Sequence, residues 1–248
     1  MPSGQRVYAI GDIHGRLDLL DALIARIAQR DTEAPEVESH IVLLGDLVDR
    51  GPDSAGVVER ARELAAAGDR VHVLGGNHED MFLLAFRKPT ALRSFLRYGG
   101  RETLMSYGID GPTIDAAELA ELQALMRERV PRAHYDFLDA LPHQVRFGDY
   151  LFVHAGIDPL RPLHDQRPHD LRWIREPFLS HADSHGVVVV HGHTIVDEPD
   201  LRPNRIGLDT AAYESGRLTA LALEGTARTL IATRQDDRGR IHIESREV

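Results

Sequence analysis

The chain has 248 residues, of which 42% are hydrophobic and 27% are charged, a composition that excludes a mainly disordered protein. No apolar run reaches the about 20 residues that a membrane helix needs, and the absence of cysteine excludes disulfides and thiolate metal ligands. The net charge of −10 argues against a non-specific nucleic-acid binder.

Strands and helices alternate along the first third of the chain. Short apolar runs that stop at or near glycine predict buried strands over residues 6–10, 40–44 and 70–74. Apolar residues at helical spacing predict a helix over residues 17–27, and an Ala-, Glu- and Arg-rich stretch predicts another over 54–67. This alternation predicts βαβ units and a largely parallel sheet.

The middle and the end of the chain follow other patterns. Leucines at helical spacing predict a helical insert over about residues 86–141, which covers one edge of the sheet. Further strands are predicted over residues 144–147, 150–153, 187–190, 218–223, 228–232 and 241–243. The last three are expected to form antiparallel hairpins. We expect a single domain over residues 1–248, in the cytoplasm because the polar N-terminus carries no export signal.

Five predicted strands end in polar clusters, which contain the candidate catalytic and metal-binding side chains. The clusters are GDIHG at residues 11–15, GDLVDRG at 45–51, GNHE at 76–79, HAG at 154–156 and HGHT at 191–194. Ligands of open α/β sheets bind outside the carboxyl ends of the strands. The clusters are therefore predicted to meet at one rim of the sheet.

The residue types in these clusters suit a centre with two metal ions. Asp12 and His14 are two residues apart, so an extended segment directs both to the same side. Asp46 can bridge two ions through its two oxygens, and Asn77 offers a neutral oxygen. Imidazole nitrogens complete a mixed donor set that suits Mn²⁺, Fe or Zn²⁺ better than Ca²⁺ or Mg²⁺. Two such ions can hold a phosphate and activate a water.

In this order, the five motifs resemble the calcineurin-like metallophosphoesterase superfamily. The forms GDLVDRG and GNHE resemble its phosphoprotein phosphatase branch, and residues 204–210 and 216–221 resemble small bacterial and phage lambda-type serine/threonine phosphatases. The resemblance implies an α/β fold, in which a β-sandwich of mixed sheets is flanked by helices. It covers nearly the whole chain and is least distinctive in the insert.

The resemblance also implies a set of metal ligands with two divalent ions, for which manganese is favoured over iron and zinc. In the family pattern Asp46 is shared between the two ions. By this resemblance, the first ion is bound by Asp12, His14 and Asp46. The second is bound by Asp46, Asn77, His154 and His193.

The catalytic roles carried over from the family fall on neighbouring residues. His78 takes the place of the family's catalytic histidine, with Asp49 as its carboxylate partner that favours the imidazolium. Arg50 takes the place of the phosphate-binding arginine. The family also has a second substrate arginine before the last metal histidine, and Arg175 is preferred over Arg172 for this role.

Several residues keep two interpretations at this stage. His191 is an alternative metal ligand to His193, and Asp209 either bonds an active-site histidine or forms a turn. Glu79 is expected to orient a neighbour rather than act as an acid. Residues 98–103 form either a substrate-facing loop or a helix boundary. The other histidines, including His40, have no motif around them and are expected to be ordinary side chains.

Three functions are compatible with the motifs. The first is a phosphomonoesterase that dephosphorylates phosphoserine or phosphothreonine, and also phosphotyrosine, in proteins or peptides through a metal-bridging hydroxide with His78 as general acid. The alternative is a symmetrical diadenosine tetraphosphate hydrolase, whose second motif resembles GDLVARG and lacks the acid found here at Asp49. The third is a noncatalytic phosphate-binding protein. The sequence predicts no membrane or nucleic-acid partner and leaves the oligomeric state open.

Overall fold

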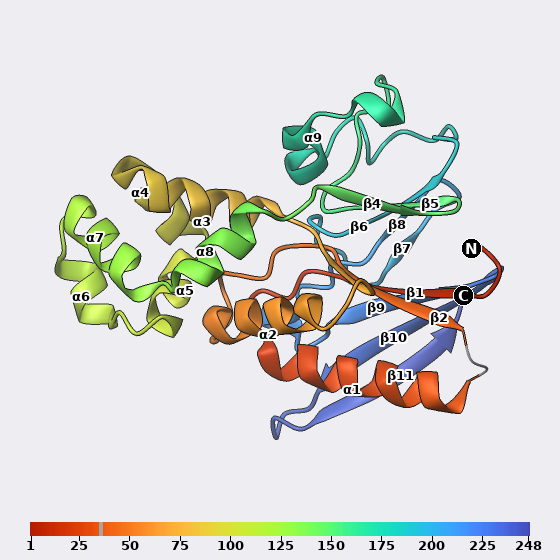
Figure 1. Ribbon diagram of the computed structural model, residues 1–248, viewed down its shortest axis with the longest axis horizontal. Helices are drawn as coiled ribbons and strands as arrows, with labels where there is room; N and C mark the ends of the chain where they lie inside the picture. The colour runs from red at the N-terminus through yellow and green to blue at the C-terminus, as the bar shows by residue number, and fades with distance from the viewer. Residues whose placement is uncertain (35–36) are drawn as a thin grey trace.

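Two β-sheets packed face to face form the centre of the protein (Figure 1). The computed structural model describes residues 1–34 and 37–248. The first sheet has the strand order β11-β10-β9-β1-β2-β3. Its strands are β1 (Gln5–Ile10), β2 (Glu38–Leu43), β3 (Val71–Val73), β9 (Thr219–Glu224), β10 (Ala227–Gln235) and β11 (Ile241–Glu247). Strands β1, β2 and β3 run parallel, whereas β9, β10 and β11 join antiparallel.

The second sheet has the order β4-β5-β6-β8-β7 and is also mixed. Its strands are β4 (Gln144–Phe147), β5 (Tyr150–Val153), β6 (Val188–His191), β7 (Asp200–Leu201) and β8 (Arg205–Gly207). A long connection between β5 and β6 contains the short helix α9 (Pro168–Trp173) on the outer face of this sheet (Figure 1).

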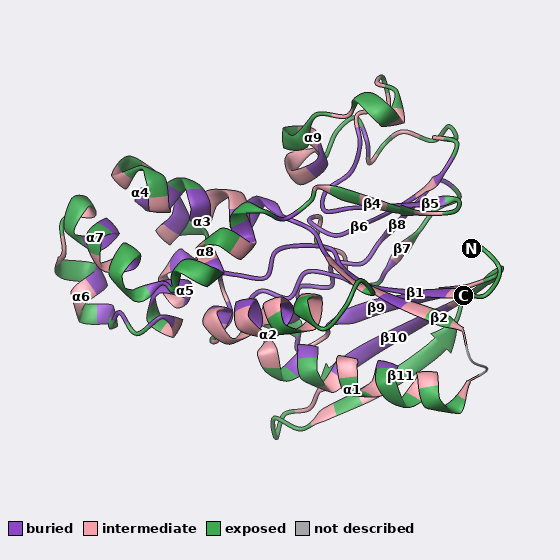
Figure 2. Cartoon of the chain, viewed as in Figure 1, coloured by how far each residue is buried: buried purple, intermediate pink, exposed green. Residues whose placement is uncertain are grey.

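The apolar core lies in layers on both sides of each sheet. Successive side chains of a strand point to opposite faces, so Val7 and Ala9 of β1 pack between the sheets while Tyr8 and Ile10 pack under the helices. In β5, Phe152 likewise faces the inner layer with Tyr150, whereas its neighbours face α9. Figure 2 shows this burial as purple strands β1, β9 and β10 behind helices with exposed outer faces. Burial on both faces explains why the central strands are continuous apolar runs.

Helices cover the outer face of the first sheet and extend beyond it. The helices α1 (Leu17–Glu33) and α2 (Ser54–Ala66) lie on this face, and α2 begins where the Asp53 side chain accepts a hydrogen bond from Gly56 N–H at 2.8 Å. We call the group from α3 to α8 the helical arm. It comprises α3 (Asn77–Arg87), α4 (Leu92–Phe95), α5 (Arg101–Ser106), α6 (Gly111–Ala116), α7 (Leu119–Arg129) and α8 (Arg132–Asp139). The last helix, α10 (Ala212–Ser215), follows β8.

The predicted sandwich of mixed sheets flanked by helices is confirmed, but the expectation of one largely parallel sheet is wrong. The strands that carry the polar clusters belong to two sheets, because β1, β2 and β3 lie in the first and β5 and β6 in the second. The strands β7 and β8 were not predicted, since segments of two and three residues give no periodic signal. Among the described residues, the helices are too short or too polar to cross a membrane.

Candidate metal centre

The predicted ligands gather where the carboxyl ends of strands from both sheets meet. Asp12 and His14 follow β1, Asp46 follows β2, and Asn77 opens α3 just after β3. From the second sheet, His154 and His193 follow β5 and β6. The rim expected on one sheet is therefore a seam between two sheets, and the packing of the sandwich brings its halves together.

The backbone of these loops is held in an unusual conformation. Only a few per cent of residues other than glycine have positive φ, and such residues concentrate at functional sites. In the described chain the non-glycine residues with positive φ are His14 (46°), Asp46 (48°), Asp49 (75°), Arg50 (70°), His193 (62°) and Ala211 (53°). All but the last are predicted site residues. Backbone bonds between loops hold this geometry, as when the Asp46 carbonyl accepts from the N–H of His14 at 2.8 Å.

One group of candidate metal-ligand atoms lies around Asn77. Its Oδ1 lies 2.9 Å from His154 Nε2 and 2.8 Å from His193 Nδ1. His154 Nδ1 donates to the Leu44 carbonyl at 2.9 Å, so its Nε2 carries a lone pair rather than a proton. Burial lowers the pKa of His154 to about 3 and that of His193 to about 2, so both rings are neutral at pH 7. The lone pairs of Asn77 Oδ1 and His154 Nε2 face each other, an arrangement that suits a cation bound to both.

Asp46 links this group to a second one. Its Oδ1 lies 3.4 Å from His154 Nε2, while its Oδ2 lies 3.5 Å from His14 Nε2 and 3.9 Å from His78 Nε2. His14 Nδ1 donates to the Val48 carbonyl at 2.8 Å, which again leaves Nε2 as an acceptor. The two candidate metal groups are thus His14, Asp46 and His78, and Asp46, His154 and His193. With one oxygen toward each group, Asp46 has the geometry of a bridging ligand.

Asp12 lies at the edge of this arrangement. Its carboxylate oxygens accept from the backbone N–H of His193 at 3.2 and 3.0 Å. Burial and the nearby charges of Asp209 and Asp46 raise the pKa of Asp12 well above its usual value. A Cβ on Gly192 would come 1.9 Å from Asp12 Oδ1, so only glycine fits beside it. A cation at Asp12 would relieve the repulsion among these carboxylates.

His78 and Asp49 form a buried pair next to the candidate metal groups. His78 Nδ1 donates to Asp49 Oδ2 at 2.6 Å, and the fully buried Asp49 also accepts from the Thr103 hydroxyl at 2.6 Å. The Asp49 N–H donates to Ser54 Oγ at 3.0 Å and to Thr103 Oγ1 at 2.9 Å. These contacts fix the orientation of His78, whose other nitrogen, Nε2, faces the cavity.

The electrostatics of this pair differ from the sequence expectation. We expected Asp49 to favour the imidazolium, but burial is the largest effect and lowers the pKa of His78. Burial also raises the pKa of Asp49 well above its usual value. Burial therefore disfavours the charged form of both partners.

Glu79 supports the loop of Asp46, as the sequence suggested. Its Oε2 accepts from the N–H groups of Gly76 at 2.8 Å and Asp46 at 2.9 Å, and its Oε1 accepts from Leu47 at 2.8 Å and Val48 at 3.3 Å. Burial and the charge of Asp46 raise the pKa of Glu79 to about 8, while these N–H groups act in the opposite direction. Glu79 is buried and acts on the backbone rather than on a ligand.

The cavity beside the candidate metal groups contains Arg50 and Arg175. Its volume is about 130 Å³, and its lining consists of Asp46, Arg50, Asn77, His78, Arg175, His193 and Ile195. Arg50 donates to His14 Nε2 at 2.9 Å and to His78 Nε2 at 3.1 Å. Arg172 instead pairs with Asp80 at 3.4 Å and is absent from the described lining. The structure thus places Arg175, and not Arg172, at this cavity.

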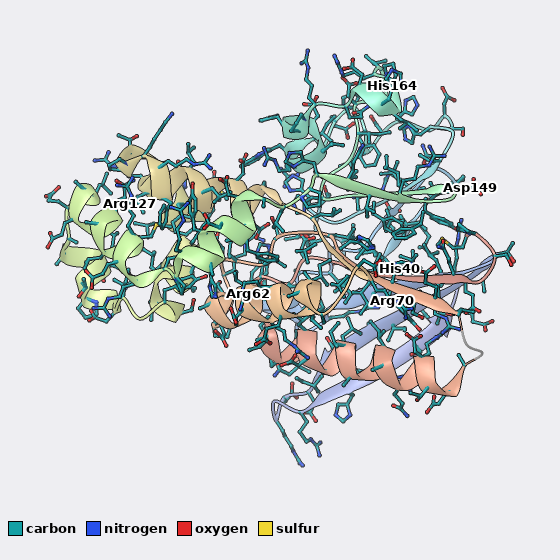
Figure 3. The ribbon with its side chains drawn as sticks, in the orientation of Figure 1. His40, Arg62, Arg70, Arg127, Asp149 and His164 are labelled. Carbon is teal, nitrogen blue, oxygen red and sulfur yellow. The ribbon has the colours of Figure 1, made fainter. Side chains whose placement is uncertain are left out.

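The remaining histidines lie apart from the two groups. His191 sits at the end of β6 with its ring against Phe178, and its Nδ1 faces the Gly192 carbonyl at 3.0 Å. Figure 3 labels His40 on β2 and His164 in the connection near α9, on different parts of the molecule. The choice of His193 over His191 therefore agrees with the geometry.

Sequence reasoning missed Tyr213 and the contact that Thr103 makes with Asp49. Thr103 stands in the stretch 98–103, for which a substrate-facing loop and a helix boundary were equally acceptable; Gly99 has a φ of 107° just before α5, so a helix boundary is present. The Tyr213 ring lies 4.8 Å from the guanidinium carbon of Arg50 and 5.5 Å from the His14 ring. No local pattern predicts these contacts, because each residue reaches the site from a distant segment.

A family model described as calcineurin-like phosphoesterase matches residues 5–218. A symmetrical bis(5′-nucleosyl)-tetraphosphatase of Acidovorax sp. (strain JS42) is 35% identical over 71% of this chain and 48% of its own length. This chain therefore spans about half the length of that relative. An asymmetrical bis(5′-nucleosyl)-tetraphosphatase, PrpE of Oceanobacillus iheyensis, is 24% identical over 93% of both chains.

A likeness in structure accompanies these matches. A crystal structure described as a "putative diadenosine tetraphosphatase" superposes with a TM-score of 0.64 at 23% identity, covering 97% of this chain and 93% of that one. At this identity the likeness shows the shared fold.

The names of the curated relatives overturn the protein-phosphatase prediction. That prediction depended on Asp49, the acid that separates GDLVDRG from GDLVARG. The structure shows why this residue is a poor guide to substrate: Asp49 has no exposed surface and contacts His78, Ser54 and Thr103. A side chain buried in this way cannot contact the part of a substrate beyond its phosphate. It therefore cannot distinguish a peptide from a nucleotide.

Proposed function

Because the chain belongs to the calcineurin-like phosphoesterase family, we propose that it is a metal-dependent bis(5′-nucleosyl)-tetraphosphatase that cleaves its substrate symmetrically. The observation that carries the proposal is the 35% identity to a symmetrical tetraphosphatase over 71% of the chain. Symmetrical cleavage adds one water to the dinucleotide and releases two nucleoside diphosphates.

The ligand roles are part of the same proposal. Asp12, His14 and Asp46 would hold one ion, and Asp46, Asn77, His154 and His193 the other. Manganese suits this mixed oxygen and nitrogen set, as do iron and zinc. When bound, two divalent ions neutralise phosphate charge and supply an activated water.

The residues of the chain itself would then position the reacting phosphate. Arg50 and Arg175 enter the cavity from different segments, and their guanidinium groups can bind phosphate oxygens with paired N–H donors. His78 Nε2 faces the same cavity and, when the ring is protonated, would donate a hydrogen bond or a proton to the departing oxygen. Asp49 fixes the tautomer of His78 through the bond at Nδ1.

Product analysis tests this function directly. The Mn²⁺-loaded protein is incubated with diadenosine tetraphosphate, and the nucleotides are separated by ion-exchange chromatography. We expect ADP as the only product. AMP together with ATP would show asymmetrical cleavage, which the match to PrpE over nearly the full length of both chains makes the second candidate. An intact substrate at high enzyme concentration would refute both.

The cytoplasmic location and the absence of nucleic-acid partners stay predictions from the sequence.

A further inference from the structure

A second cavity opens beside the metal-side cavity and shares Arg50 with it. Its volume is about 430 Å³. We call it the arginine–tyrosine pocket, and its lining consists of Arg50, Leu96, Arg97, Tyr98, Gly99, Arg101, Glu102 and Tyr213. Most of this lining comes from the stretch between α4 and α5 in the helical arm, and Tyr213 comes from α10.

The two cavities differ in volume, so they suit different parts of a substrate. Sites for small organic ligands are usually about 300–1,000 Å³. The metal-side cavity, at about 130 Å³, has room for a phosphoryl group but not for a nucleoside. The arginine–tyrosine pocket falls within the range for organic ligands. A nucleotide whose phosphate lies at the metal centre must place its nucleoside outside the smaller cavity, and this pocket is next to it.

The chemistry of the pocket matches a nucleoside phosphate. Three arginines face one carboxylate, Glu102, among the described lining residues, so the pocket is positive overall. Arg101 is paired with Asp115, whereas no hydrogen bond or ion pair engages the Arg97 side chain within residues 1–34 and 37–248. Guanidinium groups bind phosphate, and aromatic rings stack on bases.

The two tyrosines supply the stacking surfaces. Tyr98 is 51% exposed, and the Arg97 guanidinium carbon lies 5.9 Å from the centre of its ring. Tyr213 is half-buried against Arg50. A large aromatic side chain left exposed beside an unpaired arginine has the composition of a nucleotide site rather than of a packed surface.

The backbone ties this pocket to the reacting centre. The Arg50 N–H donates to the Gly99 carbonyl at 3.0 Å, and a Cβ on Gly99 would come 2.6 Å from Arg50 N. The Arg50 guanidinium also reaches His78 Nε2 at 3.1 Å. The pocket therefore adjoins both rings that Arg50 contacts, His14 at 2.9 Å and His78 at 3.1 Å, and lies beside the reacting centre.

We infer that the arginine–tyrosine pocket binds a nucleoside phosphate part of the substrate, with its base on Tyr98 and its phosphate on Arg97. This inference rests on the proposed function for the identity of the substrate, but binding of a nucleotide in the pocket can be measured without turnover.

Calorimetry on the Mn²⁺-loaded protein tests the pocket with ADP and inorganic phosphate as probes. Tyr98→Ala and Arg97→Ala should each raise the Kd for ADP about tenfold and leave the Kd for phosphate within about twofold. Tyr98→Phe keeps the ring and should bind ADP like the parent protein. Arg93→Ala removes an exposed arginine of α4 outside the pocket lining and should also have no effect. Unchanged ADP binding in Tyr98→Ala and Arg97→Ala would overturn the inference.

Kinetics separate this inference from the proposed function. We expect Tyr98→Ala and Arg97→Ala to lower kcat/KM for diadenosine tetraphosphate about tenfold and to spare methyl phosphate, whose departing group is too small to reach the pocket. Equal losses on both substrates would indicate damage to the metal centre and overturn the pocket. If the parent protein binds ADP through Tyr98 but does not cleave the dinucleotide, the proposed function fails and the pocket stands.

Discussion

The hydroxyl of Thr103 offers the sharpest test of the buried pair. Thr103 Oγ1 donates to Asp49 Oδ1 at 2.6 Å, accepts from Asp49 N–H at 2.9 Å and lies 3.0 Å from Ser54 Oγ. Thr103→Val removes these bonds and keeps the shape of the side chain. The Asp49 N–H still has Ser54 as acceptor. The principal loss is therefore one hydrogen bond to a buried carboxylate, about 1.5–3 kcal/mol.

That loss should appear in catalysis through the orientation of His78. If about 2 kcal/mol of it is lost from the transition state, kcat falls about 30-fold. KM should change little, because Asp49 and Thr103 are buried and do not line the cavity. Thr103→Ser keeps the hydroxyl and should restore most of the rate.

The assay compares two phosphate monoesters with different leaving groups. Phenyl phosphate needs a proton on its departing oxygen, whereas p-nitrophenolate leaves with little help. Thr103→Val should therefore slow phenyl phosphate hydrolysis more than p-nitrophenyl phosphate hydrolysis. Metal content and the thermal midpoint are measured beside the rates. Equal slowing of both esters, or an equal loss in Thr103→Ser, would refute the idea that Thr103 positions the pair through its hydroxyl.

Three further changes test other parts of the centre. Glu79→Gln turns an amide NH₂ toward backbone N–H donors, so we expect about 2–3 kcal/mol less unfolding free energy in urea; an unchanged midpoint would contradict this. His193→Asn should remove bound metal, measured by mass spectrometry, whereas His191→Asn should not, and the reverse result would make His191 the ligand. Chelation with EDTA should lower Tm because bound ions stabilise the folded state, and a constant Tm would speak against metals between these carboxylates.

The elements and the motif positions followed from the sequence because their signals are local. The run Val7–Ile10 is apolar because β1 is buried on both faces, and it ends at Gly11, where a Cβ would come 2.6 Å from the Leu208 carbonyl oxygen. The donor types after five strands were enough to predict a metal centre, since a ligand's chemistry belongs to its own side chain. The helical spacing of its leucines also predicted the helical arm.

Tertiary structure decided which of these residues meet and what else meets them. His193 and Asn77 are 116 residues apart and follow strands of different sheets, and Thr103 reaches Asp49 across 54 residues. Such contacts depend on how the sandwich and the helical arm pack, which no periodic pattern encodes. For the same reason Asp49 misled the choice of substrate: its sequence position marks the catalytic loop, but its burial removes it from the surface where the rest of the substrate binds.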